Sequence, residues 1–209
     1  MLRNYMGVEK RMDYQHQTII LYSSQADPVL RTLESDGVCY SKAAYVRRKY
    51  EESSPIFLTV YDWYVNHAEK LVPKPEYAEF PYWAFTDSYN LDISAGGNIL
   101  TLAVPIDEVI FFRVKDWNKI LCLSLIGESD EEERKFSEEL SARGLHTTDV
   151  MLTSFYPEWK QNILSSWKRL FRFHEEMLQT APGQIHDMQA GLWRIKKEWI
   201  QSPVFPEIY

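Results

Sequence analysis

The stretch TIILYSSQADPVLRTLESDG, residues 18–37, carries the three local signals that decide the predicted fold. Residues 18–24 are β-branched and aromatic, a composition typical of a β-strand. Asp27 and Pro28 then provide a helix N-cap and a first-turn proline, and apolar residues follow at helical spacing. Gly37 stands where a helix ends in the left-handed conformation. The sequence therefore predicts a strand, a short helix and a glycine stop.

Segments of the same two kinds continue at irregular intervals along the chain. Alternating or aromatic runs predict strands over residues 80–85, 99–104, 109–114 and 188–195. Capping residues and apolar stripes predict helices over residues 42–50, 54–71, 116–121, 129–144 and 156–171. Because these elements do not alternate in βαβ units, the predicted class is α+β, with a mixed or antiparallel central sheet flanked by helices.

The chain has 209 residues and shows no internal repeat or low-complexity linker. This length suits one domain with a sizeable core, so residues 18–209 are predicted to form a single α+β domain. Residues 1–17 read as a polar N-terminal extension, since they contain basic residues but no apolar run of the signal-peptide type. No apolar run reaches the roughly 18 residues that span a bilayer. These features predict a cytoplasmic protein without a membrane segment.

The net charge of −7 and the pI near 5.3 argue against broad binding to a phosphate backbone, so nucleic acid is not an expected partner. Much of the negative charge lies in residues 128–139, where carboxylates open a predicted helix and suit its macrodipole. A solvated helix face is the simplest interpretation of that segment. The oligomeric state and the identity of a protein partner or nucleotide ligand stay open.

Cys39 and Cys122 are the two cysteines of the sequence and lie far apart. Without a secretion signal, the expected state is two reduced, buried thiols. The 5 histidines are scattered singly, and no spacing of cysteine or histidine resembles a zinc site. No metal cofactor is therefore expected.

Six blocks of the sequence resemble, in their order, a known family. The blocks are LYSSQADPVLRTLESDGVCY, FLTVYDWYV, FPYWAF, LAVPIDEVIFFRVKDWNKIL, SWKRLF and MQAGLWRIKKEWI. Together they resemble a bacterial group, domain-of-unknown-function family 3841, from about residue 18 to the C-terminus. This resemblance implies no particular activity.

A second resemblance concerns the order of the elements. ADP-ribosyltransferase-like folds open with a polar and aromatic strand, a short helix and a glycine. They have an aromatic strand in the middle and close with a strand whose acidic residue contacts the nicotinamide ribose. The resemblance implies NAD as a candidate co-substrate, held in a cleft between the first and last strands. The matching residues are Tyr22, Ser24, Gln25, Tyr82 and Trp83 for binding, and Asp187 and Gln189 for catalysis.

The sequence departs from this pattern at Gln189. Breaking the nicotinamide–ribose bond builds positive charge on the ribose, which a carboxylate stabilises. Gln189 can hydrogen-bond a ribose hydroxyl but supplies no negative charge. Asp187 lies two residues earlier, on the same face of the predicted strand, and is the substitute carboxylate. Either an enzyme or a pseudo-enzyme that binds the dinucleotide without efficient chemistry fits this pattern.

Other interpretations of the same residues remain open. Tyr22 and Trp83 also suit core aromatics, and Gln25 also suits a turn or a cap. A second functional hypothesis is a protein-binding regulatory or host–phage conflict module without catalysis, with an exposed apolar patch. A nucleic-acid-binding protein is the third hypothesis, and it requires the basic residues of 42–49 and 196–197 to converge on one face.

Overall fold

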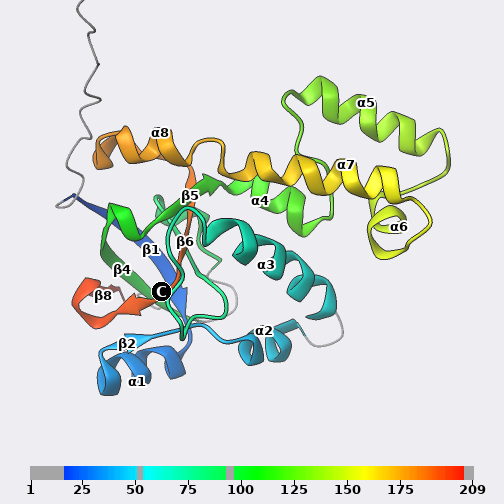
Figure 1. The fold of residues 1–209 in the computed structure, drawn as a ribbon. Coiled ribbons are helices and arrows are strands. Elements are labelled where there is room, and N and C mark those ends of the chain that lie inside the picture. The colour runs from blue at the N-terminus through cyan, green and yellow to red at the C-terminus, as the bar shows by residue number, and fades with distance from the viewer. Residues whose placement is uncertain (1–16, 51–53, 93–96, 205–209) are drawn as a thin grey trace, which may run out of the picture.

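A six-stranded sheet is the centre of the computed structural model, which describes residues 17–50, 54–92 and 97–204. The sheet order is β5-β6-β3-β1-β4-β8, and every neighbouring pair is antiparallel (Figure 1). The strands are β1 (Thr18–Gln25), β3 (Tyr82–Phe85), β4 (Asn98–Pro105), β5 (Ile110–Arg113), β6 (Met188–Leu192) and β8 (Ile200–Val204). The predicted α+β class, with one domain and an antiparallel central sheet, is confirmed. Most of the predicted extension, residues 1–16, lies outside the described residues.

Strand β1 lies inside the sheet, between β3 and β4. Ile19, Leu21 and Ser23 are buried, whereas the side chains between them are partly or fully exposed. Strand β4 pairs with β1 along its whole length. This alternation has the period of two that a strand shows when one of its faces packs on a core.

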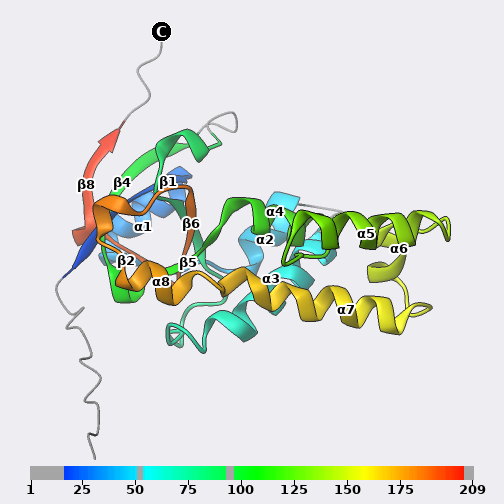
Figure 2. The same ribbon diagram turned by 90° about the horizontal axis from the view of Figure 1, so that it is seen from above.

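The helices surround the sheet unevenly. They are α1 (Asp27–Asp36), α2 (Ala43–Tyr50), α3 (Ser54–Ala68), α4 (Val114–Leu121), α5 (Asp130–Ser141), α6 (Thr147–Leu152), α7 (Pro157–Trp167) and α8 (His174–Gln179). Short 3-10 helices are η2 (Ser88–Asn90), η3 (Ile106–Glu108), η4 (Lys168–Phe171), η5 (Pro182–Gln184) and η6 (Lys197–Trp199). Strands β2 (Val38–Cys39) and β7 (Ile195–Lys196) form a separate two-stranded sheet. Figure 2 shows α5, α6 and α7 reaching away from the large sheet, and we call these three helices the helical extension.

The two faces of the large sheet pack against different cores. One face, called the apolar face, packs mainly on α1, α8 and the segment after β6. Its buried residues include Ile19, Leu21, Val29, Leu33, Leu100, Leu102, Val104, Phe111, Ala190 and Leu192. The opposite face, called the aromatic face, packs on α3, α4 and η4 through a cluster of rings. This aromatic cluster includes Tyr61, Tyr64, Trp83, Phe112, Trp117, Phe171 and Trp193.

Tyr64 of α3 fills the centre of the aromatic cluster. Its ring centroid lies 5.1 Å from that of Trp83, 5.6 Å from that of Phe112 and 5.5 Å from that of Trp117. The Tyr64 hydroxyl is completely shielded and has no hydrogen-bond partner among the described residues, and burial raises its pKa well above the ordinary value. A Cβ atom at Gly191 of β6 would overlap this hydroxyl. Glycine at position 191 therefore makes room for the ring that closes the core.

The structure corrects the predictions for one cysteine and one carboxylate. Cys39 is buried as predicted, but Cys122 is exposed because it follows the last residue of α4 at the surface. Asp116 does not cap a helix, since α4 begins two residues earlier, and its side chain is completely buried inside the first turn. Arg172 pairs with one Asp116 oxygen at 3.1 Å, and Lys119 lies 3.8 Å from the other. Asp116 thus ties α4 to the segment after η4.

The predicted final strand is also shorter than expected and is not the last in the chain. Strand β6 ends at Leu192, and β8 follows it at the sheet edge. Helices α6 and α8 have 6 residues each, and strands β2 and β7 have 2 each. Elements of this length are too short for a hydrophobic period to identify.

Candidate functional site

The strand register places a row of side chains across the aromatic face. Phe112 of β5 pairs with Gln189 of β6, which also pairs with Phe85 of β3. Phe85 pairs in turn with Tyr22 of β1, and Tyr22 pairs with Thr101 of β4. Because directly paired residues of antiparallel strands project to the same side, all of these side chains share one face. We call them the sheet-face row.

Burial decreases along the sheet-face row. Phe112 is completely buried under the aromatic cluster, and Gln189 is 4% exposed. Phe85, Tyr22 and Thr101 are only partly buried. No described residue of β1 or β4 belongs to the aromatic core. The sheet-face row therefore extends from a sealed core at Phe112 to a partly exposed part of the same face on β1 and β4. We call this part the open flank.

Gln189 is the unusual member of the row because its side-chain amide has no hydrogen-bond partner among the described residues. The residue is nevertheless only 4% exposed. Its amide is not among the completely shielded polar groups, so it keeps contact with the accessible surface. Buried amides are normally hydrogen-bonded, because an unpaired one costs free energy. The amide of Gln189 is thus unpaired among the described residues, at the edge of the open flank.

Tyr22, Ser24 and Trp83 also lie on the aromatic face, as their register with Gln189 requires. Trp83 is engaged in packing: its Nε1 donates to the hydroxyl of Tyr61 at 3.1 Å. Ser24 lies beside the loop before β4, since a Cβ atom at Gly97 would come within 2.5 Å of its Oγ. Trp83 therefore behaves as a core aromatic, whereas Tyr22 and Ser24 line the open flank.

Tyr82 and Gln25, the other two predicted binding residues, lie on the apolar face. The hydroxyl of Tyr82 donates to the sulfur of Cys39 at 3.0 Å. The amide of Gln25 donates to the hydroxyl of Ser23 at 2.7 Å, and that hydroxyl donates to the carbonyl of Trp83 at 2.6 Å. The predicted set of site residues is therefore divided between the two faces of the sheet.

The two strands that were expected to border the predicted cleft are not adjacent in the sheet. Strand β3 lies between β1 and β6, so the first strand and the strand that contains Gln189 are not side by side. Phe85 fills the intervening position of the sheet-face row. The residue alternation in FPYWAF is the sequence signal for Phe85, since it places Trp83 and Phe85 on the same face of one strand.

Asp187 lies in the turn before β6, outside the strand, so the prediction that it shares a strand face with Gln189 is wrong: the alternation of a strand does not extend to a residue in the left-handed conformation. Its φ of 56° is in the left-handed region, which aspartate tolerates better than most residues. The Asp87 carboxylate stabilises this turn by accepting from the backbone N–H of Asp187 at 2.7 Å and from the hydroxyl of Thr86 at 2.8 Å. The hydroxyl of Tyr89 donates to the Asp187 carboxylate. We call Thr86, Asp87, Tyr89, His186 and Asp187 the sheet-end cluster.

The sheet-end cluster lowers the pKa of Asp87. Burial acts to raise the pKa of Asp87, but bonds from the Asp187 N–H, the Thr86 hydroxyl and His186 outweigh it, and the pKa lies below the ordinary value. The hydrogen bond to Asp187 raises the pKa of Tyr89 to about 12. Asp87 therefore gives the cluster a negative charge at neutral pH.

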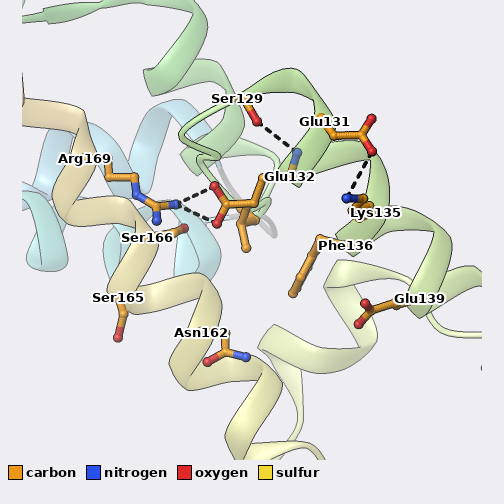
Figure 3. A pocket seen from close by; sticks show the side chains of 11 residues that line it. Ser129, Glu131, Glu132, Lys135, Phe136, Glu139, Asn162, Ser165, Ser166 and Arg169 are labelled. Atoms are coloured by element: carbon orange, nitrogen blue, oxygen red, sulfur yellow. Dashed lines mark hydrogen bonds and ion pairs between the residues drawn. The ribbon is translucent and has the colours of Figure 1, made fainter.

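A hollow lies in the helical extension, between α5 and α7, with a volume of about 600 Å³. Figure 3 shows Arg169 of η4 facing Glu132 of α5 across it, whereas Glu131 and Lys135 pair along α5. Arg169 lies 3.2 Å from Glu132, and Lys135 lies 3.3 Å from Glu131. These four charges are paired with one another, which suits a solvated contact between α5 and the segment of α7 and η4.

Another hollow, of about 610 Å³, lies next to the sheet-end cluster and includes His186 and Asp187 in its lining. We call it the sheet-end cavity. Within the described ranges, no group of three or more histidine, cysteine or acidic side chains is arranged to hold a metal ion. The same part of the chain contains no helix with the length and apolar character of a membrane span.

Comparison with protein-family models identifies the family of this chain. The model of the family described as "Domain of unknown function (DUF3841)" matches residues 20–201, so the chain belongs to that family. No curated protein and no solved structure matches the chain. The function must accordingly be argued from the site.

Proposed function

We propose that this protein binds a nicotinamide dinucleotide on the open flank of the sheet-face row, as an ADP-ribosyltransferase-like enzyme. The observation that carries the proposal is the buried amide of Gln189, which has no hydrogen-bond partner among the described residues. A ligand hydroxyl that bonds this amide removes the cost of leaving it unpaired. Tyr22 and Phe85, the next members of the row, offer ring surface for a flat nicotinamide.

The proposed reaction transfers ADP-ribose from NAD to water or to another acceptor. The bond between the nicotinamide nitrogen and the ribose carbon breaks, and its electron pair leaves with the nicotinamide. The acceptor forms a new bond to that carbon and releases a proton to solvent. Positive charge develops on the ribose, so a carboxylate lowers the barrier. In this assignment Gln189 orients the ribose and Asp187 supplies the negative charge.

A thermal melt with and without millimolar NAD tests the binding step. A ligand present at 100 times its dissociation constant stabilises the folded state by about 2.7 kcal/mol, which raises the midpoint of a chain of this length by about 5–10 °C. We expect this rise in the wild type and not in Gln189→Ala.

Gln25→Ala is the matched control, because it removes an amide from the same sheet but from the apolar face. The rise with NAD should persist in this variant. A rise that is equal in the wild type and Gln189→Ala, or absent from the wild type, contradicts the proposal.

The release of free nicotinamide tests the chemical step separately. Asp187→Asn keeps the shape of the side chain but removes its charge, so NAD should still raise the melting midpoint while nicotinamide release falls about tenfold or more. Binding without any nicotinamide release by the wild type would reduce the proposal to a dinucleotide-binding pseudo-enzyme.

A second candidate function, a protein-binding module without catalysis, is favoured by the tip of the helical extension. Leu152, the last residue of α6, is 56% exposed, and Phe155, in the segment that joins α6 to α7, is 79% exposed. Large apolar side chains at adjacent surface positions suit a partner protein. Immobilised wild type should then capture a partner that Phe155→Ser does not capture, with no effect of NAD on either variant.

A further inference from the structure

No member of the sheet-face row lines the sheet-end cavity, but Asp187, the carboxylate assigned to the ribose in the proposed reaction, is part of its lining. Its volume of about 610 Å³ is within the usual range for small-molecule sites. Charged and polar groups from β5, α4, α8, η2 and the turn before β6 converge on it. They include Asn90, Arg113, Lys115, Glu176, His186 and Asp187.

Arg113 is an exposed cation in the lining of this cavity and has no ion pair within the described part of the chain. Its guanidinium carbon lies 3.8 Å from the centroid of the Phe173 ring, which also lines the cavity. It forms no ion pair or hydrogen bond with a described residue. Stacking on a ring fixes the plane of a guanidinium while leaving its N–H groups available. Arg113 is therefore a preoriented donor for an anion.

Arg172 provides the contrast, because it approaches the same ring but is paired with protein groups. Its guanidinium lies 5.0 Å from the centroid of Phe173. It pairs with the buried carboxylate of Asp116 at 3.1 Å and donates to the carbonyl of Gly127 at 3.3 Å. Of the two arginines beside Phe173, Arg113 is the one that lines the cavity and has no such partner among the described residues.

A second cation, Lys115, lines the cavity beside Arg113. It follows Arg113 in the first turn of α4, and its ammonium pairs with the exposed carboxylate of Asp130 at 3.4 Å. Both partners of this ion pair are exposed, so the pair is weak and leaves N–H groups of Lys115 available to a ligand.

The cavity also contains acceptors, which narrows the class of ligand. Glu176 of α8 and Asp187 of the sheet-end cluster are both part of its lining. A bare anion gains nothing from these carboxylates, whereas a ligand with hydroxyl groups donates to them. Arginine and lysine on one side and carboxylates on the other suit a molecule with a phosphate at one end and a sugar at the other.

We propose that the sheet-end cavity binds a phosphorylated sugar, with its phosphate on Arg113 and Lys115 and its hydroxyls on Glu176 and Asp187. The ligand is either a free sugar phosphate or the ribose phosphate part of a dinucleotide, and the two sources share this chemistry.

Isothermal titration calorimetry with ribose 5-phosphate at low ionic strength tests the proposal. We expect Arg113→Gln to weaken the affinity about tenfold or more, because it removes a charge-assisted bond, and Lys115→Gln to weaken it less. Ribose, which has no phosphate, should bind much more weakly than ribose 5-phosphate. Lys115 is 63% exposed, so its variant keeps the test valid even if Arg113→Gln perturbs folding.

Arg31→Gln is the matched control, since Arg31 is an exposed arginine of α1 and is not part of the cavity. Equal loss of affinity in Arg31→Gln and Arg113→Gln overturns the proposal, and so does equal binding of ribose and ribose 5-phosphate. Absence of binding by the wild type at about 10 mM ribose 5-phosphate overturns it as well.

A parallel titration with NAD identifies the source of the ligand. If Arg113→Gln weakens NAD and ribose 5-phosphate by the same factor, the cavity holds part of the dinucleotide. If it weakens only ribose 5-phosphate, the cavity serves a separate ligand. Gln189→Ala should leave ribose 5-phosphate binding unchanged, so failure of the dinucleotide proposal and failure of this one give different results.

Discussion

The aromatic face of the sheet is covered by helices over one part and partly exposed over the other. Over β5, β6 and β3 the rings of α3, α4 and η4 close it, and Phe112 and Tyr64 are completely buried. Over β1 and β4 the same face remains partly exposed, with Tyr22, Ser24 and Thr101 in its surface. Gln189 lies at the boundary between the sealed part and the open part.

This difference shows that residue type alone does not separate structural from functional side chains. Trp83 and Tyr22 are both aromatic residues on one face, yet Trp83 bonds Tyr61 and contacts several rings, whereas Tyr22 contacts no ring of the described chain. The partners that a side chain already has decide whether it is available to a ligand. Substitutions in the sealed part and the open part of the aromatic face should therefore differ in their effect on stability.

The largest effect is expected from opening the sealed part. Phe112→Ala removes a completely buried ring of the aromatic cluster and should lower the free energy of unfolding by about 3–5 kcal/mol. Urea unfolding followed by tryptophan fluorescence measures this loss. A loss under about 1 kcal/mol would mean that the cluster is not a sealed core.

A smaller loss should follow from overpacking the same region. Gly191→Ala places a methyl group against the hydroxyl of Tyr64 and should cost about 1–3 kcal/mol. Tyr64→Phe removes that hydroxyl, which has no hydrogen-bond partner among the described residues, and should restore part of the loss in the double variant. Additive losses from the two substitutions would contradict the contact.

His174, which packs against the apolar face, provides a third test of whether the core is closed to water. Burial lowers the pKa of His174, whose Nδ1 accepts from the N–H of Phe111 at 3.3 Å. The unfolded chain binds a proton near the ordinary pKa of about 6.5, whereas the folded state resists protonation to lower pH. Stability should therefore fall as the pH drops through about 6.5, and melts of wild type and His174→Gln should show a flatter fall in the variant. An equally steep fall in both would exclude His174 as the cause.

The smallest effect is expected on the open flank. Thr101→Ala replaces a partly exposed side chain of the sheet-face row and should change the free energy of unfolding by less than about 0.5 kcal/mol. The same urea titration measures it beside Phe112→Ala. A loss comparable to that of Phe112→Ala would show that β1 and β4 are sealed as well.

Most individual elements of the fold can be predicted from the sequence, because their signals are local. The alternation in residues 18–24 predicts β1, and Ser129 caps α5 by accepting from the N–H of Glu132 at 3.2 Å, as its position indicates. The side-by-side order of the strands is not local. Nothing within residues 80–85 indicates that β3 separates β1 from β6.

The candidate site shows the same difference between local features, which the sequence reveals, and non-local features, which it does not. Gln189 is recognisable as an unusual polar residue in an apolar strand, and the sequence pattern identifies it. Arg113 is not recognisable, because its significance depends on Phe173 and on a cavity formed by segments far apart in the chain. Tyr82 and Gln25 are misplaced for a related reason: alternation assigns residues to two faces but does not say which face stays open.

The sheet order also constrains how the protein is made. Strand β6 inserts between β3 and β5, both of which leave the ribosome before it, and the interval from Arg113 to Met188 is 75 residues (188 − 113). At about 5–20 residues per second, synthesis of this interval takes roughly 4–15 s, during which β3 and β5 each present an unpaired edge. The speed of translation through this segment, and the access of chaperones to those edges, are therefore part of what determines the yield of folded protein.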